Sequence, residues 1–147
     1  MIRPILEYAS ATWSAYTIQN ITKLEKVQRQ SAQFVLNDYS RYSSVANMLN
    51  VLRWPTLENQ RDIQTLILFY KILHNYIHTP SDYLVPSLST AITQGYNQRF
   101  QLPFARTNAY KDSFFIRAIN LWNNLPGHLV NQPTIQLFKS QLRALVL

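Results

Sequence analysis

The sequence contains no cysteine and only two glycines among its 147 residues. Without cysteine there is no disulfide, no thiol nucleophile and no Cys-ligated zinc. Gly95 and Gly127 lie too far apart to form a Gly-rich phosphate-binding loop. No uninterrupted apolar run approaches the length of a membrane span, and no signal peptide is visible. We therefore expect an intracellular protein, in the cytoplasm or the nucleus, with no membrane association.

Charged residues are also few. They make up 14% of the chain, whereas hydrophobic residues make up 47%, a balance typical of a folded domain with a substantial core. Fourteen basic and seven acidic residues give a net charge of +7. This charge is compatible with simple solubility and also permits nucleic-acid binding. No dense Lys/Arg cluster decides between the two.

Hydrophobic periodicity predicts a mainly α-helical fold, an irregular bundle of about six helices. The expected helices span residues 3–15, 18–36, 44–52, 57–78 and 113–125, and a last one begins at Thr134. The sequence from Thr79 to Lys111 is expected to be irregular, with room for one short β-hairpin around residues 99–106. Thr56 is the expected N-cap of the longest helix, and Asn37-Asp38 the stop of the second.

The core is expected to contain aromatic residues and one apolar stripe on each helix. Residues 18–36 carry the stripe Ile21, Leu24, Val27, Ser31, Phe34 and Val35. Five aromatic residues are assigned to the core rather than to ligand contacts, namely Trp13, Phe34, Trp54, Phe115 and Trp122. The cluster of Glu58, Arg61 and Asp62 is interpreted as a solvated helix face.

Catalytic and metal-binding patterns are weak. His74 and His78 share one face if the helix runs to residue 78, but no third ligand is evident. Their alternative interpretation is as two surface imidazoles near a helix end. None of the serines lies in the Gly-x-Ser-x-Gly motif of a nucleophilic serine. No two carboxylates are placed as a general acid and a general base would be. We expect no enzyme activity, no metal and no cofactor.

Aromatic and basic residues alternate toward the C-terminal half. They are Tyr96, Arg99, Phe100, Phe104, Arg106, Tyr110, Lys111, Phe114, Phe115 and Arg117. Aromatic stacking beside cations is what single-stranded nucleic-acid binding requires. The same residues are also typical of a loop that packs over a core. Composition alone favours this second interpretation over nucleic-acid binding.

Five groups of short motifs then follow one another along the chain. They are Arg3-Pro4-Ile5-Leu6-Glu7-Tyr8-Ala9-Ser10 with Trp13; Lys23-Leu24-Glu25-Lys26-Val27-Gln28-Arg29 with Phe34-Val35-Leu36-Asn37-Asp38-Tyr39; Leu52, Trp54-Pro55-Thr56-Leu57-Glu58, Arg61-Asp62 and Leu68-Phe69-Tyr70-Lys71-Ile72; Arg99-Phe100, Leu102-Pro103-Phe104-Ala105-Arg106-Thr107, Ser113-Phe114-Phe115, Arg117 and Leu121-Trp122-Asn123-Asn124-Leu125-Pro126; and Phe138-Lys139-Ser140-Gln141-Leu142. In this order they resemble the region after the catalytic palm in reverse transcriptases of non-LTR retrotransposons (long interspersed elements). The resemblance covers nearly the whole chain.

The resemblance implies a non-catalytic fragment of an RNA-directed DNA polymerase. Residues 1–40 resemble part of the helical thumb and residues 41–147 the post-thumb C-terminal region, expected to form one compact unit. The family's palm carries two adjacent metal-binding aspartates, and no Asp-Asp pair occurs here. The expected partners are RNA or DNA, bound weakly, and the missing palm and fingers of the parent enzyme. Gln30, Gln33 and Gln101 stand where the family usually has basic residues, which is expected to weaken binding.

Two contact regions are expected for nucleic acid. One is the face of residues 18–36 that carries Lys23, Lys26 and Arg29. The other contains Arg99, Arg106, Tyr110 and Arg117. One alternative is a helical protein-interaction module whose charge only solubilises it, and a second is a small metal-dependent enzyme using the two histidines.

Overall fold

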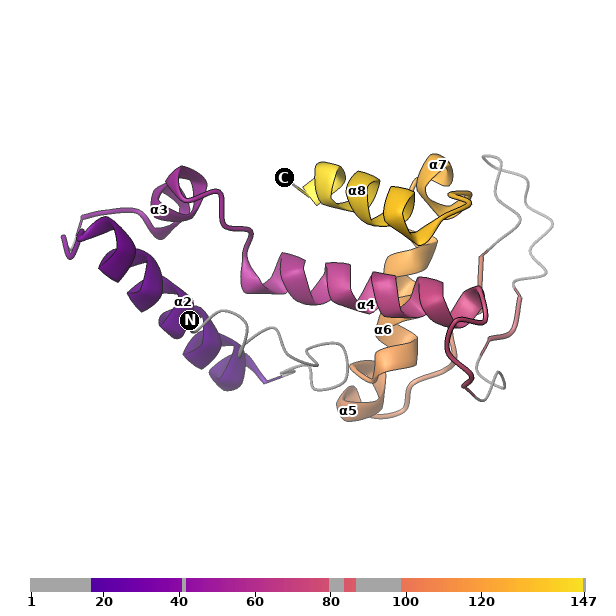
Figure 1. The fold of residues 1–147 in the computed structure, drawn as a ribbon. Coiled ribbons are helices and arrows are strands. Elements are labelled where there is room, and N and C mark those ends of the chain that lie inside the picture. The colour runs from indigo at the N-terminus through magenta and orange to yellow at the C-terminus, as the bar shows by residue number, and fades with distance from the viewer. Residues whose placement is uncertain (1–16, 41, 80–83, 87–98, 147) are drawn as a thin grey trace. The chain divides into compact units, whose positions relative to one another are not determined.

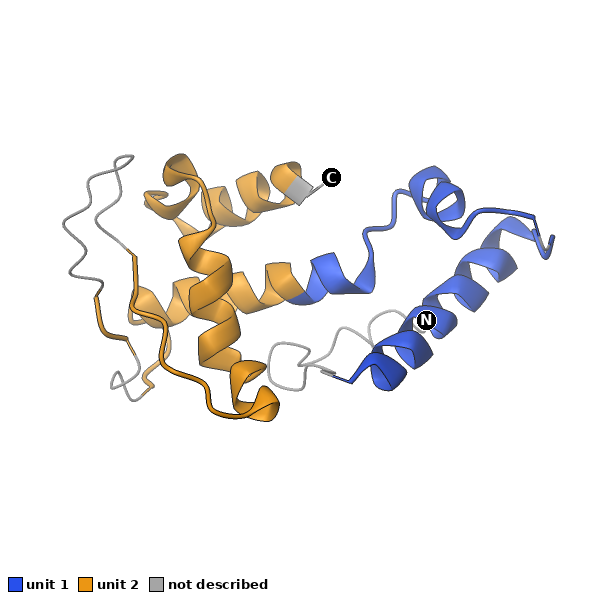
Figure 2. Cartoon of the chain, turned by 180° about the vertical axis from the view of Figure 1, so that it is seen from behind, with its two compact units in different colours: residues 1–61 blue, residues 62–147 orange. Residues whose placement is uncertain are grey.

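A computed structural model describes residues 17–40, 42–79, 84–86 and 99–146 of the chain (Figure 1). Within these residues the fold is mainly α-helical, which confirms the predicted class, with seven helices and no β-strand. The chain divides into two compact units, Met1–Arg61 and Asp62–Leu147 (Figure 2). The division into thumb and post-thumb regions expected after residue 40 stays a prediction from the sequence.

Unit 1 contains α2 (Ile18–Leu36), α3 (Val45–Val51) and the first turn of α4 (Leu57–Leu73). The predicted helix 3–15 lies outside the described residues. α2 and α3 pack around a small buried cluster of Ala32, Met48 and Leu49. Four partly buried side chains surround it, namely Leu36, Val45, Leu52 and Trp54. Thr56 caps α4 as predicted, since its Oγ1 accepts the Asn59 N–H at 3.2 Å.

Helices α2, α3 and α4 all end on a residue in the left-handed backbone region. These residues are Asn37 (φ 51°), Arg53 (φ 51°) and Asn75 (φ 57°). In each case the next N–H bonds back to the carbonyl five positions earlier, as in a Schellman motif: Asp38 to Gln33, Trp54 to Leu49 and Tyr76 to Lys71. Glycine is the usual residue at this position, and this glycine-poor chain uses asparagine and arginine there.

The prediction that the longest helix continues to residue 78 is wrong. α4 ends at Leu73, because Asn75 adopts the left-handed conformation and its neighbours close the helix there. Asparagine tolerates this conformation better than other residues with a Cβ, and hydrophobic periodicity does not reveal this tendency.

Unit 2 contains the remainder of α4 and four further helices within the described residues. They are α5 (Asn108–Lys111), α6 (Phe114–Asn123), α7 (Gly127–Val130) and α8 (Ile135–Val146). The sequence predicts α6 and α8 well but misses both single-turn helices. α5 lies in the segment expected to be irregular, where Thr107 Oγ1 accepts the Tyr110 N–H. α7 directly follows Pro126, which was interpreted only as the end of the preceding helix.

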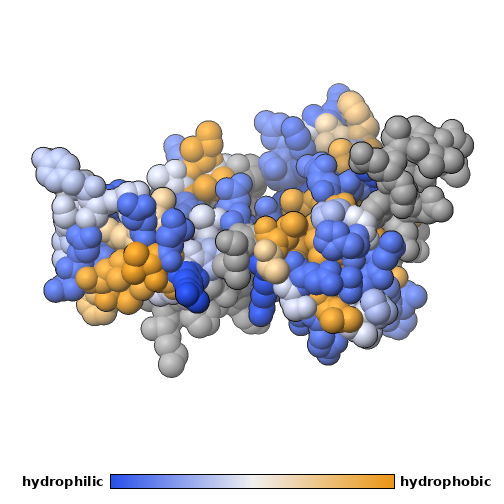
Figure 3. Space-filling view, turned by 90° about the horizontal axis from the view of Figure 1, so that it is seen from above, coloured by the Kyte–Doolittle hydropathy of each residue, from blue (hydrophilic) through white to orange (hydrophobic). Residues whose placement is uncertain are grey.

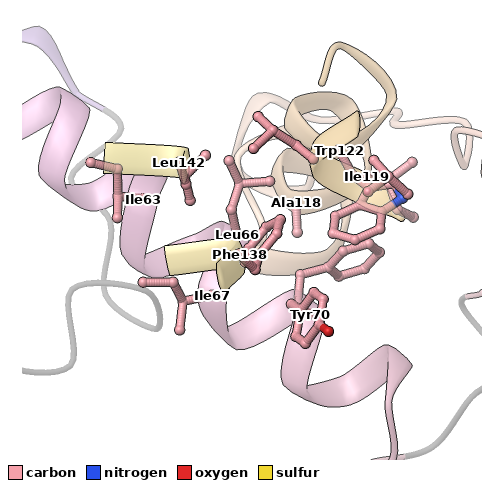
Figure 4. Packing of buried hydrophobic residues seen from close by; sticks show 12 residues of the cluster. Ile63, Leu66, Ile67, Tyr70, Ala118, Ile119, Trp122, Phe138 and Leu142 are labelled. Carbon is pink, nitrogen blue, oxygen red and sulfur yellow. The ribbon is translucent and has the colours of Figure 1, made fainter. Parts of the chain in front are cut away.

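The core of unit 2 lies where α4, α6 and α8 meet, with α7 beside them (Figure 4). Its twelve buried residues are Ile63, Leu66, Ile67, Phe69, Tyr70, Ala118, Ile119, Trp122, Leu129, Val130, Phe138 and Leu142. Phe69 and Trp122 pack edge to face at 5.4 Å, and Tyr70 stacks on Phe138 at 4.6 Å. The Tyr70 hydroxyl donates to the Gln132 carbonyl at 2.7 Å, which satisfies its polar end.

The expected core aromatics divide into two groups. Trp122 is buried, Phe115 packs against the core of unit 2, and Trp54 packs against the cluster of unit 1, as predicted. The assignment of Phe34 to the core is wrong, because this side chain is 77% exposed. Trp13 lies outside the described residues.

The apolar stripe expected on α2 is correct only in part. Four of its members are half-buried, namely Ile21, Leu24, Val27 and Ser31. Val35 is exposed together with Phe34, whereas Ala32 and Gln28 are buried. Ala32 belongs to the cluster formed with α3, and Gln28 Nε2 donates to the Pro55 carbonyl at 2.9 Å. A small side chain and a hydrogen-bonded amide therefore face the interior, and hydrophobicity alone does not identify either of them.

The irregular segment is anchored to α6 at Phe100. The Asn123 side chain accepts the Phe100 N–H at 3.0 Å and donates to its carbonyl at 2.8 Å. An isolated antiparallel bridge pairs Phe100 with Pro86 where a hairpin was expected. The β-hairpin expected around residues 99–106 is not formed, since no residue of this range lies in a strand.

Candidate nucleic-acid interface

A groove of about 580 Å³ runs along one side of α2 in unit 1. It is lined by Thr22, Glu25, Lys26, Arg29, Gln30, Gln33 and, from α3, Val45. The α2 residues recur at steps of three and four, so they share one helical face. The groove therefore carries two cations and one carboxylate, although most of its lining surface is apolar.

Two of the three cations predicted on α2 lie in this groove. Lys26 and Arg29 line it and are exposed. Lys23 is also exposed but does not line the groove; it lies one turn before Lys26 on the helix. Lys26 and Arg29 can thus act on one ligand, with Lys23 beside them.

Five groove residues were not proposed as contacts from the sequence, and three of them can interact strongly with a charged ligand, namely Glu25, Gln30 and Gln33. Gln30 and Gln33 were noted only as missing charges, and Glu25 only as part of a motif. Their spacing from Lys26 and Arg29 is the signal that identifies them, since positions three or four apart on a helix are neighbours. Each glutamine amide offers both donors and an acceptor to a ligand in the groove.

Glu25 is the acidic member of the groove and is half-buried. Burial raises the pKa of its carboxyl above the ordinary value of 4.5, and this effect exceeds the opposing influence of Arg61. Glu58 raises the Glu25 pKa further. Arg61 itself is only 8% exposed, so the expectation that it lies on a solvated helix face is wrong.

Two buried amides fix α2 against the start of α4. Gln28 Nε2 and Gln60 Nε2 both donate to the Pro55 carbonyl, at 2.9 and 3.1 Å. Both side chains are more than nine-tenths buried. The shared carbonyl holds the two helices at a fixed position in unit 1, and it thereby supports the helix that carries the groove.

The second predicted region lies in unit 2 and is only partly available to a ligand. Arg99 and Arg106 are exposed, and Tyr110 is 40% exposed. Arg117 is half-buried, and its Nη2 donates to Thr65 Oγ1 of α4 at 3.1 Å. Arg117 therefore stabilises the contact between α6 and α4, whereas the other three side chains remain at the surface.

The histidine pair does not form the arrangement expected for a metal site. His74 lies just past the end of α4 and stacks on Tyr70 at 4.0 Å, and His78 follows the turn at Asn75. The expectation that both rings share one helix face is therefore wrong. Among the described residues, no three histidine or carboxylate side chains come together as a metal site would require.

Two findings bear on the expected absence of a membrane association and on the family resemblance. In the described part of the chain, none of the helices has the length and apolar character needed to cross a membrane. Searches against protein-family models, curated proteins and solved structures find no match. The resemblance to retrotransposon reverse transcriptases stays a prediction from the sequence.

Proposed function

We propose that this chain is a non-catalytic nucleic-acid-binding fragment that contacts a phosphate backbone through the α2 groove. In this proposal it corresponds to the thumb and post-thumb region of a non-LTR retrotransposon reverse transcriptase. It would help the parent enzyme hold its RNA template and target DNA. The observation that carries the proposal is the placement of Lys26 and Arg29 in one groove.

The chemistry of the groove suits a polyanion. Arginine offers a planar fork of donors that matches phosphate, and lysine adds a compact charge. Release of counterions from the nucleic acid then supplies much of the binding free energy. Two cations are few compared with the roughly six to ten phosphate contacts of strong binders. We therefore propose weak binding with little sequence preference.

The proposal assigns no polymerase chemistry to the chain. The sequence has no pair of adjacent aspartates, and phosphoryl transfer of this kind needs carboxylates to hold metal ions. In the parent enzyme that role would belong to the palm, which is the proposed protein partner. The purified chain is expected to bind nucleic acid without extending a primer.

Single substitutions along α2 test the proposal. We expect Lys26→Ala and Arg29→Ala each to weaken binding of a labelled single-stranded RNA by about threefold to tenfold at low salt, because each removes one phosphate contact. Lys23→Ala is the matched control, with the same loss of charge on the same helix but outside the groove. Fluorescence anisotropy measures all three. Equal effects of the three substitutions would contradict a specific role for the groove.

Exposed apolar residues favour a second candidate, a helical protein-interaction module. The largest exposed side chains around the end of α2 are Phe34 (77%), Val35 (55%), Tyr39 (64%) and Tyr42 (96%). Figure 3 shows hydrophobic side chains at the surface of the α2–α3 region at its left. An apolar contact of this kind would barely respond to salt, whereas phosphate binding weakens steeply. Salt dependence therefore separates the two candidates.

A further inference from the structure

We infer that Glu25 limits the affinity of the α2 groove for a nucleic-acid backbone and makes that affinity depend on pH. The inference rests on the proposed function, since it concerns the same groove. It assigns to Glu25 a role opposite to that of Lys26 and Arg29. The carboxylate repels the phosphates that the two cations attract.

The position of Glu25 in the groove carries the inference. It lines the groove together with Lys26 and Arg29, and it lies four residues before Arg29. Side chains at this spacing are neighbours on a helix, and glutamate preceding a basic residue is the favourable orientation for attraction. A phosphate that approaches Arg29 in the groove therefore meets a carboxylate on the same helical face.

Within the described part of the chain, the charged groups around Glu25 come from two helices. On α2 they are Lys26 and Arg29 of the groove, and on α4 they are Glu58 and Arg61, which both act on the Glu25 carboxyl. α3 carries no charged residue. Burial dominates this balance and raises the Glu25 pKa, so the carboxyl takes up its proton at a higher pH than an exposed glutamate does.

Protonation of Glu25 changes the charge of the groove by one unit while the phosphodiester stays ionised. The groove then keeps both cations and loses its anion, so binding tightens as the pH falls. A single charge at a separation of several Å through a solvated groove corresponds to an increase in affinity of about threefold to tenfold. We expect this increase as the pH falls toward the raised pKa of Glu25, which lies above the ordinary value of 4.5.

A pair of isosteric substitutions tests the inference. Glu25→Gln removes the carboxylate charge from the groove, and Glu58→Gln removes a carboxylate near the same Arg61 but outside the groove. Both variants have the same net charge and keep all three histidines, so they differ only in which carboxylate is removed. The measurement is the anisotropy of a labelled single-stranded RNA of about 16 nucleotides, titrated with the full chain at several pH values.

We expect Glu25→Gln to bind about threefold to tenfold more tightly than wild type near pH 7, with a nearly flat pH profile. Glu58→Gln is expected to keep a pH-dependent affinity but to move the change to lower pH, because the Glu58 charge raises the Glu25 pKa. Circular dichroism confirms that each variant is helical, and the pH profile of the wild-type chain provides a second readout that needs no substitution.

Two outcomes overturn the role of Glu25 alone. One is a Glu25→Gln variant that keeps the wild-type affinity and pH profile, and the other is an equal effect of both substitutions, which would reflect net charge rather than the groove. Failure of the proposed function looks different. In that case neither wild type nor variant binds RNA even at low salt, and the inference falls with it.

Discussion

At the scale of single residues, Asn123 joins the irregular segment to α6. Its amide makes both hydrogen bonds that a neighbouring strand would make to Phe100. This contact also places the Phe100 ring edge to face against Phe69, at 5.7 Å. One side chain therefore orders the backbone next to the exposed Arg99.

Replacement of Asn123 tests this role. We expect Asn123→Ala to destabilise the chain by about 1–3 kcal/mol, because two partly buried backbone groups of Phe100 lose their partner. Asn124→Ala is the matched control, since the Asn124 amide only donates to the Asn120 carbonyl one turn back and is exposed. Urea unfolding followed by circular dichroism measures both. Similar losses in the two variants would contradict the role of Asn123.

Asp38 gives the turn after α2 a dependence on pH. Its carboxylate accepts the Ser43 hydroxyl at 2.6 Å and the Ser40 N–H at 3.0 Å, and these hydrogen bonds lower the Asp38 pKa below its ordinary value of 3.8. A lowered pKa stabilises the fold above the unfolded value, and this stabilisation is lost as the pH falls through the folded value.

We therefore expect Asp38→Asn to lower the urea unfolding midpoint at about pH 7, and to lower it less as the pH falls below the ordinary Asp38 value of 3.8. The measurement is urea unfolding of wild type and variant across this range. A difference between them that stays constant with pH would show that the charge of Asp38 has no role in the turn.

The candidate site could be predicted in part from single residues. Lys26 and Arg29 were found because charge and helical spacing are both visible in the sequence. Arg117 was predicted as a contact, but its hydrogen bond to Thr65 joins residues 52 positions apart. No local pattern reveals such a pairing, and a cation that stabilises packing looks the same in sequence as one that binds phosphate.

At the scale of elements, the ends of the helices in unit 1 use residues with a Cβ where glycine is usual. Arg53 is the most unfavourable of these, because asparagine tolerates the left-handed region better than arginine does. The Trp54 N–H, which bonds to the Leu49 carbonyl at 2.8 Å, requires this conformation. The end of α3 therefore carries backbone strain that a glycine would relieve.

We expect Arg53→Gly to stabilise unit 1 by about 0.5–1 kcal/mol relative to Arg53→Ala. Both substitutions remove the same charge and long side chain, so the comparison isolates the backbone. Thermal unfolding at equal ionic strength measures the difference. If the Arg53→Ala variant were as stable as the Arg53→Gly variant, this would contradict the claim that residue 53 is strained in its left-handed conformation.

Helix positions were predicted more accurately than helix faces. α2 spans the predicted range, because its start, its periodicity and the Asn37-Asp38 stop agree. Its buried side could not be predicted, since burial depends on where α3 packs, and the buried residues include Ala32 and Gln28. α5 and α7 were missed because a single turn is too short to show a helical period.

At the scale of the whole molecule, the two units differ in the size of their cores. The buried cluster of unit 2 contains twelve residues, whereas that of unit 1 contains three among the described residues. Buried apolar area is the main source of local stability. The helix that carries the groove thus belongs to the less strongly packed unit.

Hydrogen exchange tests this difference. We expect the amides of α2 and α3 to exchange at least about tenfold faster than those of α6 and of the α4 residues after Ile63, because opening of unit 1 exposes less apolar surface. Mass spectrometry of peptides from each helix measures the rates. Equal protection of α2 and α6 would show that the two units open together.

The central proposal is that the chain binds a nucleic-acid backbone through Lys26 and Arg29 and has no catalytic role of its own. The most direct test is the affinity of the wild-type chain for a labelled single-stranded RNA between about 50 and 200 mM salt. If two cations contact phosphates, the logarithm of the affinity falls linearly with the logarithm of the salt concentration, with a slope of about −1.4. An affinity that does not change with salt, or no binding at low salt by chain shown to be folded, would contradict the claim.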